Sequence, residues 1–341
     1  MEKFDGLPFV LSWELTLECN LNCSHCGSSA GYTRVNELTL EESLAICDQF
    51  PDLLVQEVDF TGGEPLLSPH LLKIARHINK LDILMQLITN GLLLKPDIIG
   101  KIKETGISAI GVSLDGIPET HDYIRGDKGL FQRVLAGIEN AHNGGFDVTV
   151  ITTVNPLNIN ELPAMIEILK SIGVNRWQVQ PVFPMGRSLD DKKLHLTEQT
   201  YLKFGSFIRD WSSEAKKDGM QIETADSYGY FTNYDQRNIP FRGCPAGLVT
   251  CGITSDGKIK GCLSLPDDQI EGDLRKTDLW DIWFNPNAFS YTRQFSPNDI
   301  GSNCISCEHI EQCKGGCSAM SYSCTEAYHN DPFCFYRLVE K

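Results

Sequence analysis

The sequence has no apolar run of the roughly 18 residues that a membrane-spanning helix needs. Its first residues, MEKFDGLPFVLSW, contain one lysine before a short apolar run, so they lack the basic segment and the cleavage site of a secretory signal. Positive charge is also scarce, with 30 Lys and Arg against 45 Asp and Glu and a formal net charge of -15. We therefore expect a cytoplasmic protein that binds neither nucleic acid nor membranes.

Cysteine is missing between Cys47 and Cys244, although the chain of 341 residues has 13 cysteines. The odd number argues against a framework made only of disulfides, which are also rare in a reducing compartment. Three cysteines cluster near the N-terminus and nine fill the last hundred residues. This clustering indicates metal binding.

Six short apolar runs alternate with helical patterns over the first half of the chain, at 11–17, 55–61, 83–89, 107–114, 147–154 and 176–182. Such alternation predicts a parallel sheet with helical crossovers. The sheet is either doubly wound or closed as a barrel, and six units are too few for a full eight-stranded barrel. In both cases functional residues belong at the carboxyl ends of the strands.

The pattern changes after residue 182, and we divide the chain into three ranges. Residues 8–182 form the α/β domain, and residues 183–242 form a linker with one helix at 198–217. Residues 243–341 are rich in Gly and Cys and poor in apolar runs, so they cannot bury much core. We expect this last range to fold around metal.

The N-terminal cysteines, Cys19, Cys23 and Cys26, lie just after the first predicted strand. Thiolates suit iron–sulfur clusters or zinc. A structural zinc site needs four ligands, so the zinc alternative requires His25 as the fourth. A [4Fe–4S] cluster held by three cysteines instead leaves one iron open for a cofactor or substrate.

The motifs CNLNCSHC, TGGEP, TNG, VSLDG and HDYIRG follow one another in this order, and together they resemble the radical SAM (S-adenosylmethionine) superfamily. The resemblance implies a partial (β/α)6 TIM-like barrel with the open iron ligated by SAM. It assigns cofactor-binding roles to residues at or beyond the ends of three predicted strands: Gly62, Gly63, Glu64, Asn90, Ser113 and Arg125. Ser113 and Arg125 hold the ribose and carboxylate of SAM, and a carboxylate suits a forked guanidinium. His25 departs from the family, which usually has an aromatic residue there.

The resemblance also implies the chemistry. A flavodoxin or ferredoxin type electron donor reduces the cluster, SAM is cleaved, and the resulting 5′-deoxyadenosyl radical abstracts hydrogen from a substrate carbon. The protein positions the cofactor and excludes water.

The C-terminal cysteines resemble a SPASM domain, which carries two auxiliary [4Fe–4S] clusters, giving three clusters in all. The resemblance assigns one group of cysteines to auxiliary cluster I: Cys244, Cys251, Cys262 and Cys317. It assigns another to auxiliary cluster II: Cys304, Cys307, Cys313 and Cys334. If Cys251 is not a ligand, cluster I has an open iron. On spacing alone, zinc is an alternative for these sites.

Two cysteines remain outside these assignments. Cys47 falls in an apolar helical pattern, which predicts a buried free thiol. Cys324 is either structural or a thiol that returns a hydrogen atom to a substrate radical.

SPASM relatives mostly modify peptides or proteins, so the resemblance implies a peptide substrate and a peptide maturase. Sulfatase maturases carry an aspartate where this chain has Leu263, which argues against that activity unless Asp226, Asp235 or Asp267 replaces it. With the first strand near residue 11, we expect no N-terminal leader-binding domain, and a separate leader-binding protein is one alternative. A small-molecule or tetrapyrrole substrate is another, and a non-enzymatic iron–sulfur electron carrier is a distant third.

Overall fold

The computed structural model describes residues 6–225, 228, 230 and 241–340, and it is built around one ten-stranded sheet. The strands are β1 (Val10–Glu14), β2 (Glu57–Thr61), β3 (Leu84–Thr89), β4 (Ala109–Ser113), β5 (Asp147–Val154), β6 (Arg176–Pro181), β7 (Gln221–Thr224), β8 (Thr250–Ile253), β9 (Lys258–Lys260) and β10 (Gly272–Asp273). Their order across the sheet is β10-β9-β8-β1-β2-β3-β4-β5-β6-β7.

Eleven α-helices accompany these strands in the described residues. They are α1 (Leu40–Cys47), α2 (Leu71–Asn79), α3 (Pro96–Lys103), α4 (Pro118–Arg125), α5 (Leu130–Asn143), α6 (Leu162–Ser171), α7 (Glu198–Lys217), α8 (Leu279–Trp283), α9 (Ser290–Arg293), α10 (Ile310–Cys313) and α11 (Ser318–Thr325). None of the helices in the described part of the chain has the length and apolar character to span a membrane.

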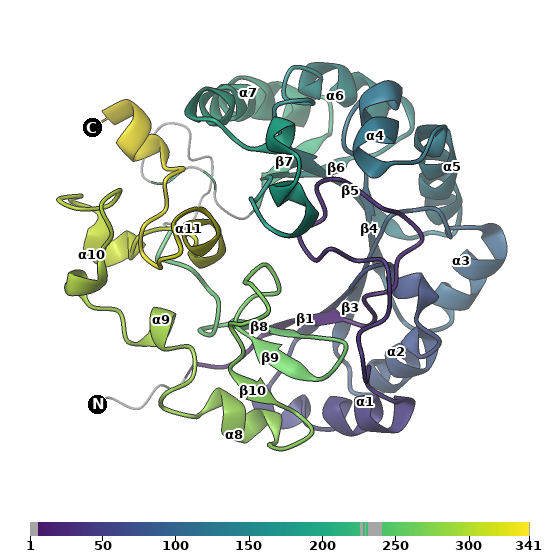
Figure 1. The fold of residues 1–341 in the computed structure, drawn as a ribbon. Coiled ribbons are helices and arrows are strands. Elements are labelled where there is room, and N and C mark those ends of the chain that lie inside the picture. The colour runs from purple at the N-terminus through teal and green to yellow at the C-terminus, as the bar shows by residue number, and fades with distance from the viewer. Residues whose placement is uncertain (1–5, 226–227, 229, 231–240, 341) are drawn as a thin grey trace.

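The first six strands pair in parallel and in sequence order, which confirms the predicted partial (β/α)6 barrel. Figure 1 shows the sheet curving into an open ring with helices α1 to α6 on its outer side. Along β5 the side chains alternate between buried and half-buried, as expected for a strand whose two faces meet helices and the barrel interior. The buried faces form the main core, which includes Trp13, Phe60 and Trp177.

Two further strands extend this parallel sheet beyond the six that the sequence predicts. β7 lies in the range read as linker and helix, and it pairs in parallel with β6. β8 lies in the cysteine-rich range and pairs in parallel with β1, with Cys251 opposite Leu11. The cysteine-rich region is therefore joined to the barrel by backbone hydrogen bonds at the barrel's first strand.

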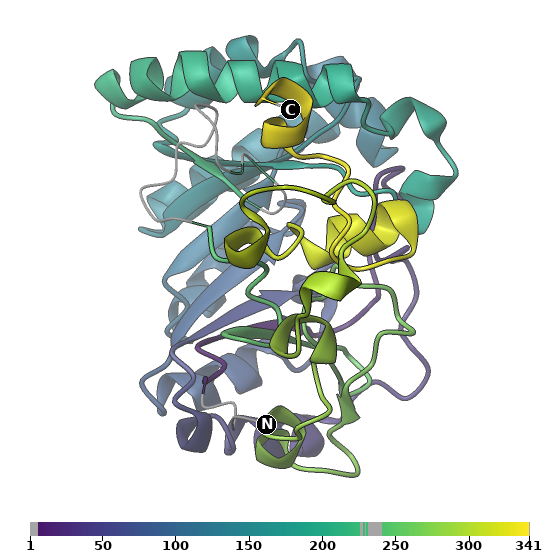
Figure 2. The ribbon, with the colours of Figure 1, turned by 90° about the vertical axis from the view of Figure 1, so that its left-hand side faces the viewer.

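The cysteine-rich region lies across the open side of the ring (Figures 1 and 2). Its helices are short, between four and eight residues, as the weak periodicity of the sequence suggests. Near the C-terminus, Phe335 stacks on Tyr201 of α7 with ring centroids 4.3 Å apart. Residues near the C-terminus are thus packed against the long helix α7, which lies beside α6 on the outer side of the ring (Figure 1).

Candidate active site

The three N-terminal cysteines lie in the loop after β1, at the carboxyl ends of the strands. Tight turns shape this loop, with the Cys26 amide donating to the Cys23 carbonyl at 3.3 Å and the Ser29 amide donating to the Cys26 carbonyl at 3.3 Å. Cys19, Cys23 and Cys26 all line one cavity of about 330 Å³. Burial raises the pKa of Cys23 to about 11, so the thiol form is favoured until a metal binds.

The glycine pair after β2 is needed for close contact between two backbone segments. The Gly63 amide donates to the Thr16 carbonyl at 2.8 Å, and the Glu64 amide donates to the Glu18 carbonyl at 2.8 Å. A Cβ at Gly62 would collide with the Thr16 carbonyl oxygen, and one at Gly63 with that of Glu18. Both glycines line the cavity, so they place an open backbone edge beside the cysteine loop.

Glu64 lies behind this edge and is fully buried. Its carboxylate accepts hydrogen bonds from the Thr89 hydroxyl at 2.8 Å and the Asn90 amide at 2.9 Å. It also accepts one from the Leu66 amide at 3.1 Å. Glu64 therefore ties the end of β2 to the end of β3, and it is not among the residues that line the cavity.

Asn90 and Ser113 occupy the ends of the next two strands and line the cavity. The Asn90 side-chain amide donates to the side-chain oxygen Oδ1 of Asn20 at 2.7 Å, which links the end of β3 to the cysteine loop. Ser113 is half-buried at the last position of β4.

Arg125 ends α4 and reaches the cavity as a buried cation. Its Nε and Nη2 donate to the same oxygen of Asp115, at 2.8 Å and 2.7 Å. Asp115 is fully buried, and although burial alone favours its neutral form, the charges of Arg125 and His25 hold its pKa far below the usual range. Asp115 is thus an anion that fixes the position of Arg125.

His25 sits within the cysteine loop, and its Nε2 is 3.1 Å from Asp115. Its Nδ1 is buried and has no hydrogen-bond partner among the described residues, while the ring lines the cavity. A buried polar atom of this kind fits a cavity that holds a polar ligand. His121 is also buried, and its Nδ1 accepts a hydrogen bond from the Asp115 amide at 3.0 Å, so it helps to hold the loop after β4 in place.

A segment after β6 holds the cysteine loop from the opposite side. The Arg187 side chain donates to the carbonyls of Cys23 at 2.8 Å and Ala30 at 2.5 Å, and its amide donates to the Cys26 carbonyl at 3.0 Å. Gly186 has φ +55°, and a Cβ there would collide with the carbonyl oxygens of Cys26 and Gly27. The segment Pro184–Arg187 falls in the range 183–242, which the sequence analysis assigns to a linker with one helix. Its position just after β6 is the one sequence feature that indicates contact with the cysteine loop.

The cysteines assigned to auxiliary cluster II come together in the C-terminal region. Four thiols line one narrow cavity with Gly315 and Gly316: Cys304, Cys307, Cys313 and Cys334. Burial raises the pKa of Cys304 to about 12 and that of Cys334 to about 11. Cys313 is buried and the other three are half-buried. A set of four soft donors around one cavity fits an iron–sulfur cluster, whose irons would displace the thiol protons.

The cysteines assigned to auxiliary cluster I are divided by the structure. Cys262 and Cys317 pack on a small apolar cluster with Leu265 and Met320. Burial raises the pKa of the Tyr291 phenol, and the nearby Cys244 and Cys262 raise it further. Cys251 instead faces the main core from β8.

Other predicted residues lie away from the cavity or outside the described residues. Cys47 ends α1 and is fully buried, as predicted. Cys324 is half-buried with its sulfur 3.6 Å from that of Met320, and it is not among the residues that line the 330 Å³ cavity. Asp226 and Asp235 fall outside the described residues. Within the described ranges, no three His, Cys, Asp or Glu side chains converge on one point as ligands of a single ion do.

Comparison with known proteins gives the same assignment as this geometry. The model of the Radical SAM superfamily matches residues 13–169. An AdoMet-dependent heme synthase of Methanosarcina barkeri is 32% identical over 362 residues, covering all of both chains. The chain belongs to the radical SAM superfamily.

Other radical SAM similarities extend over the cysteine-rich region. The mycofactocin maturase MftC of Mycolicibacterium smegmatis is 29% identical over 332 residues, covering 94% of this chain and 82% of that protein. Among solved structures, SuiB of Streptococcus suis bound to its precursor peptide SuiA has a TM-score of 0.75 at 18% identity, covering 92% of this chain and 72% of that one. Native anSMEcpe with bound AdoMet has a TM-score of 0.76 at 17% identity, covering 98% and 96%. The fold is thus that of a radical SAM barrel followed by a SPASM-type cysteine-rich region.

Proposed function

We propose that this radical SAM enzyme abstracts a hydrogen atom from an unactivated carbon of a peptide, giving a crosslink, an epimerised residue or an oxidised residue. The observation that carries the proposal is a single cavity lined by the three cysteines of the N-terminal loop, the glycine edge and Arg125. When bound there, the [4Fe–4S] cluster and SAM supply a 5′-deoxyadenosyl radical for this abstraction. The same reaction class requires a low-potential donor of the flavodoxin or ferredoxin type and a cytoplasmic location.

Different residues around the cavity would bind the cluster and SAM. Cys19, Cys23 and Cys26 would supply three thiolates, and the backbone at Gly62 and Gly63 offers hydrogen-bonding groups at close range. Arg125, fixed by Asp115, would hold the SAM carboxylate. Apolar side chains on the C-terminal side of the cavity, Phe183, Met185 and Leu263, would exclude water from the reacting centre.

A peptide substrate is supported by the length of the available space. The 330 Å³ cavity adjoins a second of about 470 Å³, and both are lined by Gly27, Met185 and Leu263. A chain longer than one residue can therefore reach from the cysteine loop toward α11. MftC is named as a maturase, and SuiB and anSMEcpe have been crystallised with peptides. The apolar Leu263 at the cavity wall supports a reaction other than sulfatase oxidation.

A tetrapyrrole substrate is the second candidate, favoured by one observation. The heme synthase of Methanosarcina barkeri matches this chain from end to end at 32% identity, which exceeds the match to MftC. The same cavity and the same hydrogen abstraction serve either substrate. A non-enzymatic electron carrier would have no use for the SAM-binding edge.

The reaction class is tested by anaerobic reconstitution with iron and sulfide, followed by SAM and dithionite. We expect 5′-deoxyadenosine from the wild type and none from the triple variant Cys19→Ala/Cys23→Ala/Cys26→Ala, which should also contain about four fewer irons. The matched control is Cys47→Ala, which removes a buried thiol outside the site. 5′-Deoxyadenosine made by the triple variant would refute the assignment.

The substrate is tested with two panels, peptides encoded beside the gene and iron coproporphyrin. The correct substrate should increase 5′-deoxyadenosine formation, and deuterium at its reactive carbon should appear in the product 5′-deoxyadenosine. Deuterium transfer from iron coproporphyrin but from none of the peptides would replace the peptide proposal by the tetrapyrrole one.

A further inference from the structure

The second cavity, of about 470 Å³, contains charged side chains to which the proposed reaction assigns no role. It is lined on its inner wall by Glu14, Arg34 and Lys260, and on its outer wall by Asp267 and α11. It adjoins the cofactor cavity, with which it shares Glu14, Gly27, Ser28, Met185 and Leu263. A ligand group bound here would thus belong to a molecule whose other end lies near the cysteine loop.

Two cations on this wall are shielded from solvent. The Lys260 side chain is 2% exposed and that of Arg34 is 18% exposed. Buried ammonium and guanidinium groups need anionic partners, because losing water costs several kcal/mol per ion. The identity of those partners determines whether the wall can bind an anion.

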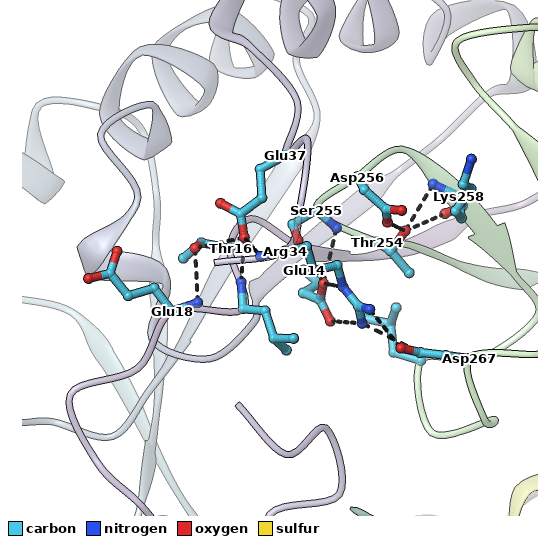
Figure 3. A network of polar contacts seen from close by, with 12 residues as sticks. Glu14, Thr16, Glu18, Arg34, Glu37, Thr254, Ser255, Asp256, Lys258 and Asp267 are labelled. Atoms are coloured by element: carbon cyan, nitrogen blue, oxygen red, sulfur yellow. Dashed lines mark hydrogen bonds and ion pairs between the residues drawn. The ribbon is translucent and has the colours of Figure 1, made fainter. Parts of the chain in front are cut away.

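Glu14 is the anionic partner of Arg34 on the inner wall, and its carboxylate already accepts several hydrogen bonds (Figure 3). Its carboxylate accepts hydrogen bonds from Arg34 Nε at 2.6 Å and Nη2 at 3.1 Å. It also accepts from the Ser255 amide at 3.1 Å and hydroxyl at 2.8 Å. Glu14 is itself buried, so it serves as a permanent counter-ion for one of the two positive charges.

Asp267 is the outer partner and differs from Glu14 in its exposure. It accepts from Arg34 Nη1 at 2.6 Å and from Lys260 Nζ at 3.1 Å, while its side chain is 60% exposed. It lies in the loop between β9 and β10, with no regular structure on either side. Because its carboxylate is still hydrated, releasing it from the two cations costs little, whereas leaving Lys260 without any anion costs much.

We propose that Arg34 and Lys260 form a carboxylate subsite for the substrate, and that Asp267 occupies this subsite until a substrate carboxylate replaces it. The subsite rests on the proposed function, since it supplies the anchor that holds the reacting carbon near the cofactor cavity. The ligand chemistry is a carboxylate, carried either by an acidic peptide or by the propionate groups of a porphyrin. The loop carrying Asp267 moves outward when the exchange occurs.

The test measures the affinity of the full-length reconstituted enzyme for two acidic probes. One is coproporphyrin III, followed by its fluorescence, and the other is an acetylated tetraglutamate peptide. The uncharged controls are coproporphyrin tetramethyl ester and acetylated tetraglutamine. We expect Lys260→Gln to weaken binding of at least one acidic probe about tenfold, since it removes a charge-assisted hydrogen bond. Asp267→Asn should tighten binding of the same probe severalfold, because it removes the competing carboxylate.

The matched control is Lys258→Gln, which removes the same charge from the same strand. Lys258 donates to Asp273 at 2.6 Å and does not line this cavity. We expect it to leave both affinities unchanged. Opposite effects of Lys260→Gln and Asp267→Asn separate the subsite from a simple structural ion pair, for which both variants would lower the melting temperature and neither would tighten binding.

Several outcomes would overturn the subsite: equal binding of acids and their uncharged controls, no effect of Lys260→Gln, or weaker binding after Asp267→Asn. Which probe responds identifies the source of the carboxylate, peptide or porphyrin. Formation of 5′-deoxyadenosine without added substrate is measured in parallel for each variant. Its absence in the wild type would count against the proposed function, whereas its presence with unchanged probe binding would count against the subsite alone.

Discussion

Asp59 carries a carboxyl group inside the barrel, and its surroundings favour the neutral form of that group. It lies on β2 two residues from Glu57, and one of its oxygens is buried with no hydrogen-bond partner among the described residues. Burial, with the neighbouring Glu57 carboxylate, raises the pKa of Asp59 to about 7. The folded protein therefore keeps a proton on Asp59 at pH values where the unfolded chain has lost it.

This shift sets the direction of a pH dependence. Because the folded pKa lies above the unfolded one, the stabilisation is fully present below pH ~4 and is lost as the pH rises to about 7. Asp59→Asn removes the titration, so the variant should be more stable than the wild type at pH 8 by up to ~4 kcal/mol, with a smaller difference at pH 5. Denaturant unfolding at the two pH values measures this, and an equal effect at both would show that Asp59 does not titrate.

Arg125 shows how one buried ion pair prepares a binding site. Asp115 receives two hydrogen bonds from it and a third from the Thr153 amide at 2.9 Å, so the guanidinium is held without help from a ligand. Arg125→Lys keeps the positive charge but loses the planar guanidinium, whose paired N–H groups can hold a carboxylate. We expect the KM for SAM to rise about tenfold, with iron content unchanged. Arg133→Lys, at an exposed ion pair with Asp127, is the control and should have no effect.

The residues that carry the site were predicted from sequence more completely than the contacts that hold them. The sequence analysis named the cysteine loop, Gly62, Gly63 and Arg125 from motifs that resemble the radical SAM superfamily, and the structure places them around one cavity. Asp115 and Glu64 act on other residues from behind the cavity. Nothing in a sequence distinguishes a carboxylate that meets a ligand from one that accepts backbone amides.

At the scale of elements, six strands were predicted because their apolar runs are long and rich in β-branched residues. β7, β8 and β9 have only three or four residues each, and β7 carries three polar side chains, Gln221, Glu223 and Thr224. Their pairing depends on neighbours brought from far along the chain. Such short strands form because a partner strand is already in place, which no local pattern records.

The segment Pro184–Arg187 leads into a short 3-10 helix, Gly186–Leu189, and Gly186 is its critical position. Gly186→Ala adds a Cβ that collides with carbonyl oxygens of the cysteine loop, in addition to the left-handed strain of ~1–2 kcal/mol. We expect the reconstituted variant to retain about four fewer irons and to make little 5′-deoxyadenosine.

Gly173→Ala is the matched control for this prediction. Gly173 has φ +74°, and a Cβ there meets no atom within 4 Å. The control therefore carries the same backbone strain without the collision, and it should lose some thermal stability while keeping its iron. If both variants lose iron to the same extent, the clamp on the cysteine loop has no special importance.

At the scale of the whole molecule, the barrel and the cysteine-rich region share one sheet. β8 is bonded to β1, and β1 leads directly into the cysteine loop, so the cysteine loop and the cysteine-rich region are connected through a single strand. The cysteine-rich region takes part in one small apolar cluster through Leu265 and Met320. It also places Trp283, Phe289 and Phe335 in the main core, so it buries more apolar side chains than the sequence predicts. We infer that the region depends on metal and on the edge of β1 for its stability.

Iron content tests this arrangement in the complete chain. If the chain binds the three four-iron clusters that its sequence predicts, we expect about twelve irons per chain after anaerobic reconstitution. Cys304→Ala/Cys307→Ala should reduce the count to about eight, because these two thiols line one cavity with Cys313 and Cys334. About four irons in the wild type with stoichiometric zinc would show that the C-terminal region is a zinc module.

The iron content of a Cys251 variant tests whether this thiol is a ligand of auxiliary cluster I. The Cys251 side chain belongs to the main core, and a charged group near it is Arg293, whereas Cys262 and Cys317 both pack against the small apolar cluster that includes Leu265 and Met320. Cys262→Ala should therefore lose about four irons, whereas Cys251→Ala should keep all twelve and lose only the stability of a buried core side chain. Retention would mean that auxiliary cluster I has three cysteine ligands and an iron open to a further ligand. A loss of four irons from Cys251→Ala would instead require β8 to turn its thiol toward Cys262 when the cluster binds.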